Sequence, residues 1–244
     1  MWDSLRAVDR LKIGLQDGIL PRGHAMMSVM RTILLLFTAT VAFSADPRTP
    51  IDNDQVKVLN VTQAPHVKTR LHDHKINRVM IYLQAGHQNI DYQDGKKVVL
   101  DWKPGEMKWS PASGMHIAEI TSDNPVTIIE IELKKPGNPS KLATGALDPV
   151  KVDPKSYKVE LENDQVRVLR VKIGPHKVAP LHEHMLNRVV TYITDQNFRV
   201  TTPDGKAETV QHKAGEVSWG TPTRHKEENL SDKPFEVVVV ELKS

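Results

Sequence analysis

The sequence of 244 residues contains no cysteine, and this absence removes several kinds of site at once. Without thiols the chain forms no disulfide bond, no thiolate metal site, no cysteine nucleophile and no lipid anchor at a cleavage point. A glycine-rich phosphate loop, a serine nucleophile elbow and the helical zinc-protease motif are also missing from the sequence. These absences exclude the enzyme classes that depend on such motifs.

A strong charge of either sign is also absent. Residues 1–44 hold five Lys/Arg and three Asp/Glu, so that 28 basic and 27 acidic residues remain after them. A nearly neutral chain gives no electrostatic reason to expect nucleic acid or an anionic membrane as a partner. We therefore expect the partner to be a small-molecule ligand or substrate.

Long hydrophobic runs are absent too. Residues 31–44 give a basic residue, a short apolar run and then Ala42 and Ser44, spaced as signal peptidase requires. The run is too short to span a bilayer comfortably. We expect residues 1–44 to be an N-terminal extension with a cleaved signal peptide, and the mature protein to be secreted or periplasmic without a stable membrane anchor. The alternative is an N-terminal helix, because helical spacing relates Leu5, Val8, Leu11 and Leu15.

What the chain does contain is a long internal repeat. Residues 53–82 and 163–192 match at a constant offset of 110, from an Asn-Asp-Gln-Val segment through a His-x-His pair to a tyrosine. A period of this length indicates a duplicated domain rather than a solenoid repeat. We expect domains at residues 50–135 and 156–244, joined by a polar, turn-rich linker at residues 136–155.

Short segments rich in valine and isoleucine, separated by glycine and proline, fill both copies. Asp94-Gly95 and Asp204-Gly205 lie between such segments and are typical of hairpin turns. Neither copy has a long segment with helical periodicity. The pattern predicts an all-β chain in which each half is a sandwich or small barrel.

Histidines recur at matching places in both copies. Residues two apart on a strand point to the same face, so His72 and His74 should point together into one barrel. The same parity applies to the second copy, and a third imidazole comes from a later strand of each half. The two expected metal-binding sets are His72, His74 and His116, and His182, His184 and His225. Three neutral imidazoles suit a divalent transition metal (Fe, Mn, Zn, Ni or Cu) and leave positions open for water or substrate.

A His-x-His pair, then Pro104-Gly105-Glu106 and a later histidine, resembles the two motifs of the cupin superfamily. The second copy, with Ala214-Gly215-Glu216 and a His-x-x-x-Asn ending at Asn229, resembles them more closely. The resemblance covers nearly all of the chain after residue 44. It implies two tandem cupin-type jelly-roll barrels, a bicupin, as a monomer or homodimer. Cupins include dioxygenases, isomerases, decarboxylases, storage proteins and sugar-binding domains, so the resemblance leaves the reaction open.

One departure from the family pattern concerns the carboxylate ligand. Metal-binding cupins usually add a glutamate four or five residues after the second histidine, where this chain has Arg78-Val79 and Arg188-Val189. Parity places both arginines on the inward face with the histidines. A guanidinium beside a divalent cation is unfavourable in a cavity of low dielectric constant.

Three interpretations of this departure remain open. In the first, three histidines hold the metal while Arg78 and Arg188 bind a substrate carboxylate, a task that suits the planar guanidinium. In the second, His66 and His176, six residues before each His-x-His pair, supply a fourth ligand. In the third, each arginine pairs with a buried glutamate and no metal binds; the candidate glutamates are Glu106 and Glu216.

The remaining candidates have less specific roles. Tyr82 and Tyr192 share the inward parity and either contact the substrate or serve as core aromatics. We interpret His87 and His212 as surface residues and Glu227-Glu228 as a solvated turn. The expected function is metal-dependent oxidation or isomerisation of a small anionic organic molecule, by a dioxygenase or isomerase of the cupin type. The alternative is a non-catalytic module that binds a carboxylate or sugar acid.

Overall fold

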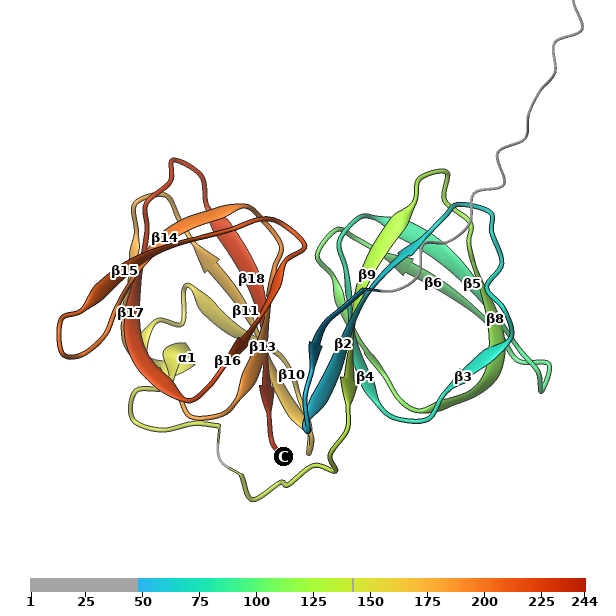
Figure 1. The fold of residues 1–244 in the computed structure, drawn as a ribbon, viewed down its shortest axis with the longest axis horizontal. Helices are drawn as coiled ribbons and strands as arrows, with labels where there is room; N and C mark the ends of the chain where they lie inside the picture. Colours follow the sequence, from blue (N-terminus) through green and yellow to red (C-terminus); the bar gives the residue numbers. More distant parts are fainter. Residues whose placement is uncertain (1–47, 142) are drawn as a thin grey trace, which may run out of the picture. The chain divides into compact units, whose positions relative to one another are not determined.

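The computed structural model describes residues 48–141 and 143–244, so the expected signal peptide lies outside the described residues. Within these ranges the chain is almost entirely β, with strands β1–β9 in a first domain and β10–β18 in a second (Figure 1). A single turn of helix, α1 (Pro149–Val152), precedes the second domain. No helix in this part of the chain has the length and apolar character needed to cross a membrane. The expected pair of β domains is confirmed.

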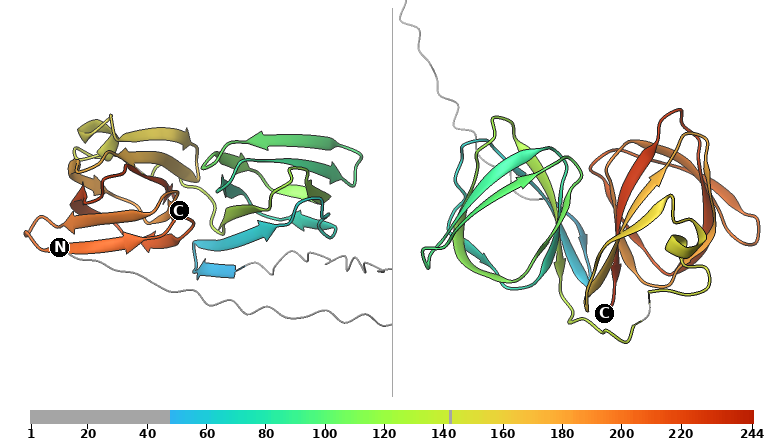
Figure 2. Two further views of the ribbon diagram at one scale, coloured as in Figure 1. Left: turned by 90° about the horizontal axis from the view of Figure 1, so that it is seen from above. Right: turned by 180° about the vertical axis from the view of Figure 1, so that it is seen from behind.

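Two antiparallel sheets form the described part of the first domain and curve into a barrel (Figure 1; Figure 2). The five-stranded sheet has the order β1 (Arg48–Asp52), β2 (Val56–Gln63), β9 (Val126–Leu133), β4 (Arg78–Tyr82) and β7 (Met107–Ser110). The four-stranded sheet has the order β3 (His72–His74), β8 (Ser113–Ile120), β5 (Gly86–Tyr92) and β6 (Lys97–Trp102).

The second domain repeats this strand order. Its five-stranded sheet runs β10 (Tyr157–Glu162), β11 (Val166–Ile173), β18 (Phe235–Leu242), β13 (Arg188–Tyr192) and β16 (Val217–Gly220). Its four-stranded sheet runs β12 (Val178–His184), β17 (Thr223–Asn229), β14 (Gln196–Thr201) and β15 (Ala207–His212). The sequence repeat is therefore a repeat of the whole topology.

Strand β9 shows how alternation divides the apolar residues between two cores. Ile129 and Ile131 belong to a core that both five-stranded sheets share, together with Val166 and Val240 of the second domain. Ile128, one residue away, packs instead with the aromatic residues inside the first barrel. Because both faces of this strand are largely buried, apolar residues occur on both, as at the adjacent Ile128 and Ile129.

Polar contacts between the domains are reciprocal. Asn77 Nδ2 donates to Gln165 Oε1 at 2.6 Å, and Asn187 Nδ2 donates to Gln55 Oε1 at the same distance. The Asn-Asp-Gln segment and the asparagine after each His-x-His pair thus meet across the domain boundary. Their repetition in the sequence is explained by this contact and not by the site.

The predicted hairpin turns are confirmed. Gly95, between β5 and β6, has φ +89°, and Gly205, between β14 and β15, has φ +85°. Glycine adopts these left-handed conformations without the steric cost that a Cβ would impose.

Candidate metal centres

Each domain brings its three histidines together, because the third lies on the strand that pairs with the first two. His72 is the register partner of His116 across β3 and β8, and His182 is the partner of His225 across β12 and β17. In both domains this pair of rings has centroids 4.5 Å apart. In each group of three, one ligand atom per histidine lies within 4.8 Å of the other two.

Backbone and carboxylate acceptors orient most of these rings. Nδ1 of His72 lies 2.7 Å from the Arg70 carbonyl oxygen, and Nδ1 of His116 lies 2.9 Å from that of Gly114. In the second domain His182 Nδ1 is 2.8 Å from the Pro180 carbonyl oxygen. A proton on Nδ1 leaves the lone pair on Nε2, which is the tautomer that a metal ligand requires.

Burial favours the neutral form of four of these imidazoles. It lowers the pKa of His74 to about 3, with the charge of Arg78 adding to the effect. It also lowers the pKa values of His116, His182 and His184 below their ordinary range. Neutral imidazoles can accept a metal ion without first losing a proton at neutral pH.

Arg78 occupies the metal-binding side of the first group. Its Nη1 lies 2.8 Å from His74 Nε2 and also donates to Glu130 Oε2 at 2.8 Å. Its Nη2 donates to Ser110 Oγ at 2.9 Å. The arginine and the glutamate are both buried, and burial raises the pKa of Glu130 while Arg78 acts to lower it. The sequence-based expectation of an arginine paired with a buried glutamate fits this domain, but the partner is Glu130 and not Glu106.

Arg188, the equivalent residue, adopts a different position. Its Nη1 donates to the Thr221 carbonyl oxygen at 2.6 Å. Gly220 stands where the first domain has Ser110, and a Cβ there would lie 2.8 Å from the guanidinium carbon of Arg188. On the neighbouring strand β18, Val239 takes the position that Glu130 has on β9. The second domain therefore lacks both side chains that hold Arg78 against His74.

A buried network orients His184. Its Nδ1 lies 2.8 Å from Glu241 Oε1, and Arg167 Nη1 donates to Glu241 Oε2 at 3.4 Å. Arg167 also makes two hydrogen bonds to Asp148, whose carboxylate caps α1 through the Val150 amide. Burial raises the pKa of Glu241 to about 7, although Arg167 acts to lower it. A segment expected only to link the domains thus contributes to the environment of a histidine.

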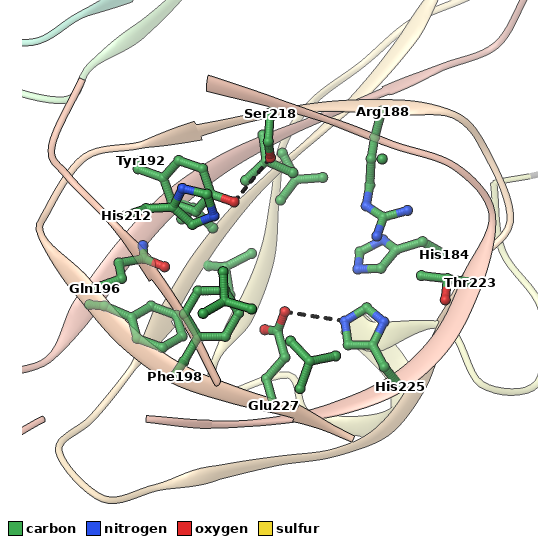
Figure 3. Close-up of a pocket in the computed structure, with 18 of the residues that line it drawn as sticks. His184, Arg188, Tyr192, Gln196, Phe198, His212, Ser218, Thr223, His225 and Glu227 are labelled. Atoms are coloured by element: carbon green, nitrogen blue, oxygen red, sulfur yellow. Dashed lines mark hydrogen bonds and ion pairs between the residues drawn. The ribbon is translucent and has the colours of Figure 1, made fainter. Parts of the chain in front are cut away.

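A cavity of about 250 Å³ opens beside the second histidine group. Figure 3 shows Arg188 and His184 on one side of this cavity, with Tyr192, His212 and Gln196 on the other. The first domain has a cavity of about 280 Å³ in the corresponding place. Each is large enough for a small organic molecule only, because sites for drug-sized ligands start at about 300 Å³.

The two tyrosines line these cavities. Tyr82 stacks on Trp102 with ring centroids 4.1 Å apart, and Tyr192 stacks on His212 at 3.8 Å. The Tyr192 hydroxyl is within 3.0 Å of Ser218 Oγ. Burial raises the pKa of both tyrosines. Both therefore remain protonated and polar at the cavity edge, as the inward parity predicted.

Two residues that line the second cavity were not predicted from the sequence to do so. His212, interpreted as a surface residue, lines the cavity through its stack on Tyr192. Glu227, interpreted as part of a solvated turn, lies on β17 with its Oε1 3.2 Å from His225 Nε2 (Figure 3). The signal for Glu227 was its spacing, since a residue two after His225 on a strand shares its face.

Glu227 is charged in this setting. Burial acts to raise its pKa, but the hydrogen bond with His225 and the nearby charge of Arg188 act to lower it, and the pKa lies below its ordinary value. The Tyr157 hydroxyl donates to Glu227 Oε2 at 3.4 Å and lies 3.2 Å from His182 Nε2. Glu227 thus brings a negative charge to the three histidines.

His66 and His176 lie apart from the histidine groups. His66 is largely exposed with Nε2 3.2 Å from Asp123 Oδ1, and His176 Nε2 is 2.8 Å from Asp232 Oδ1. Their φ values of 58° and 53° are left-handed, a conformation that glycine adopts at a lower steric cost than histidine. Neither is placed to supply a fourth ligand.

The other sequence candidates form surface contacts. Glu106 accepts from the Lys108 ammonium at 2.6 Å, and Glu216 lies 3.0 Å from His212 Nδ1. His87 is exposed and pairs with Asp101. Glu106 and Glu216, the candidates from the sequence, therefore do not line the two cavities.

Comparison with solved structures identifies similar folds. Oxalate decarboxylase from Bacillus subtilis, in a study of its Mn(II) centres, matches with a TM-score of 0.55 and 15% identity, over 82% of this chain and 76% of that chain. AerE from Microcystis aeruginosa matches with a TM-score of 0.56 and 13% identity, over 83% of this chain and 99% of that chain. At such identities the likeness concerns the fold alone. The sequence matches no protein-family model and no curated protein.

Proposed function

The chain has a cupin fold of two jelly-roll domains, and from this premise we propose that it binds a divalent transition metal and acts on a small organic carboxylate. The observation that carries the proposal is the second histidine group. Its imidazoles are buried, burial lowers the pKa values of His182 and His184, and these two are oriented through Nδ1 toward fixed acceptors. A cavity with an inward arginine adjoins them.

The donor set fits a divalent transition metal. Imidazole nitrogen binds Fe, Mn, Zn, Ni and Cu, so the set by itself selects none of them. Mn(II) is the first ion to test, because Mn(II) centres are named for the Bacillus subtilis oxalate decarboxylase of similar fold. The residues that would hold it are His182, His184 and His225.

Arg188 is placed to bind the carboxylate of the substrate. Its guanidinium faces the cavity, and one of its nitrogens is fixed by the Thr221 carbonyl oxygen at 2.6 Å. The remaining N–H groups suit a carboxylate, which the planar guanidinium binds through two parallel hydrogen bonds. Gln196 and Tyr192 offer further polar contacts across the cavity.

Apolar side chains close the rest of the cavity and exclude water. Phe198, Val239 and Val237 belong to this lining. When bound, the metal would supply Lewis acidity and a site for oxidation or isomerisation chemistry at the substrate. The side chains would bind, orient and desolvate the carboxylate next to that site.

The alternative function is non-catalytic binding of a carboxylate or sugar acid. It is favoured by the first domain, where the Arg78 guanidinium contacts His74 Nε2 at 2.8 Å. We further propose, on the sequence alone, that the mature chain is secreted or periplasmic and is a monomer or homodimer. The large apolar core shared by the two domains supports the monomer, since it already covers one broad face of each five-stranded sheet.

Metal analysis of protein purified without a nickel column separates the two functions. Under the metal-dependent proposal, the protein retains close to one equivalent of transition metal after dialysis, and His184→Ala loses it without unfolding. Small carboxylates should bind more weakly to protein treated with a chelator. Less than a tenth of an equivalent of metal, with undiminished carboxylate binding, would establish the binding module instead.

A further inference from the structure

We propose that Glu227 is the carboxylate ligand of the metal in the second domain. The inference rests on the metal binding proposed above and assigns a residue that the His-x-His pattern does not predict. Glu227 lies on β17, two residues after His225, and its side chain lines the same cavity as His184 and His225.

The distance between donor atoms supports coordination of one ion. Ligand nitrogens and oxygens lie about 2.1 Å from a zinc-sized ion, so neighbouring donors at a right angle are about 3.0 Å apart. Glu227 Oε1 and His225 Nε2 are 3.2 Å apart. Figure 3 shows the carboxylate projecting into the space beside His225, on the cavity side of the ring. The Tyr157 hydroxyl, which donates to Glu227 Oε2, also lies 3.2 Å from His182 Nε2, so the carboxylate adjoins a second histidine of the group.

The charge of the metal ion gives an independent reason to expect a carboxylate ligand. Three neutral imidazoles add no negative charge, and a dication in a buried site is costly without a counter-ion. Glu241 is screened from the cavity by His184, whose Nδ1 it contacts at 2.8 Å. Glu227 is thus the carboxylate that meets the ion directly, while its second oxygen accepts the Tyr157 hydroxyl at 3.4 Å.

The first domain provides an internal contrast. Ala118 stands two residues after His116, where the second domain has Glu227. The carboxylate of its cavity, Glu130, is engaged by Arg78 at 2.8 Å. The set of four ligands therefore belongs to the second domain, and we expect the tight metal site in that domain.

The test is Mn(II) binding by equilibrium dialysis to the full chain, freed of metal with a chelator. Glu227→Gln should weaken binding by more than about 10-fold. Glu227→Asp keeps a carboxylate and should bind more tightly than the glutamine variant. The matched control is Glu228→Gln, which alters the adjacent, partly exposed glutamate that pairs with Arg199. Its affinity should equal that of the wild type.

The visible spectrum of the Co(II)-loaded protein supplies a second measurement, because it responds to a change of ligand. Glu227→Gln should alter this spectrum and Glu228→Gln should not. If the wild type binds no metal, the proposed function fails together with this inference. If the wild type binds metal and Glu227→Gln leaves either the affinity or the Co(II) spectrum unchanged, Glu227 is not a ligand and the proposed function stands.

Discussion

The first domain should bind metal measurably only after Arg78 is removed. In the present arrangement the guanidinium donates to His74 Nε2 and is held by Glu130. The perturbation is the double variant Arg78→Met with Glu130→Val. Removing both partners leaves no unpaired buried charge, and apolar replacement of a buried ion pair is often neutral or stabilising. Valine is also the residue that the second domain carries at the position of Glu130, since Val239 pairs with Val190 as Glu130 pairs with Met80.

The size of the effect follows from the contacts that a metal would displace. A hydrogen bond that involves a charged group contributes about 1.5–3 kcal/mol, and 1.4 kcal/mol is about a tenfold change in affinity. Loss of the bond to His74 therefore weakens binding by about 10- to 100-fold. If the guanidinium stayed about 5 Å from a dication, repulsion at an effective dielectric constant of 20 would add roughly 6 kcal/mol. The wild type should thus hold one tight equivalent of Mn(II), and the double variant should hold a second, weaker equivalent, because its first domain has no counterpart of Glu227.

Metal content after equilibrium dialysis against Mn(II) at concentrations from limiting to excess, read by elemental analysis, measures the stoichiometry, and urea denaturation shows whether the variant is folded. The matched control is Arg199→Met with Glu228→Val, which removes an exposed arginine–glutamate pair of the second domain at 3.2 Å. This control variant should bind one tight equivalent of Mn(II), as the wild type does. Two equivalents of equal affinity in the wild type, or one equivalent in a folded double variant, would refute the reasoning.

Two further predictions concern stability. In metal-free protein the free energy of unfolding should rise with pH between about 3 and 6.5, because His74 has a pKa of about 3 when folded and binds a proton in the unfolded state over this window. Glu241 opposes this between about 4.5 and 7, but three other histidines with lowered pKa values reinforce it. Urea denaturation at pH 4.5 and 6.5 with a chelator measures the difference, and equal stability at both would contradict it. His176→Gly should leave metal content unchanged and shift stability by about 1 kcal/mol or less, because glycine relieves the left-handed strain and adds unfolded-state entropy. A loss of metal in this variant would restore His176 as a ligand.

The features that the sequence predicted correctly are those with a local period. Alternation along a strand placed His182 and His184 on one face, and the asparagine–glutamine repeat marked the duplication. The Asp-Gly turns followed from the left-handed conformation that glycine permits. Each of these signals is contained within a few adjacent residues.

The features that the sequence missed depend on pairing between strands far apart in the chain. Arg78 and Arg188 have the same local surroundings, yet they differ because β7 offers Ser110 in one domain and β16 offers Gly220 in the other. The partner of Arg78, Glu130, comes from β9, more than 50 residues later. Without knowledge of register, the arginines could be placed on the inward face but not given their contacts.

Residues shared by the two copies prove to be a weaker guide to function than residues that differ between them. His66 and His176 recur, as do the asparagines at the domain boundary, and their contacts are structural. The histidine groups recur as well, so repetition alone does not separate a site from a scaffold. The differences between the two copies do separate them, because those near the histidines change the charge around a bound metal ion. With Ala118 in place of Glu227 the first cavity lacks that negative charge, and Glu130 holds the Arg78 guanidinium beside His74. The two histidine groups therefore differ in the charges that surround them, and the charges in the second domain favour the binding of a dication.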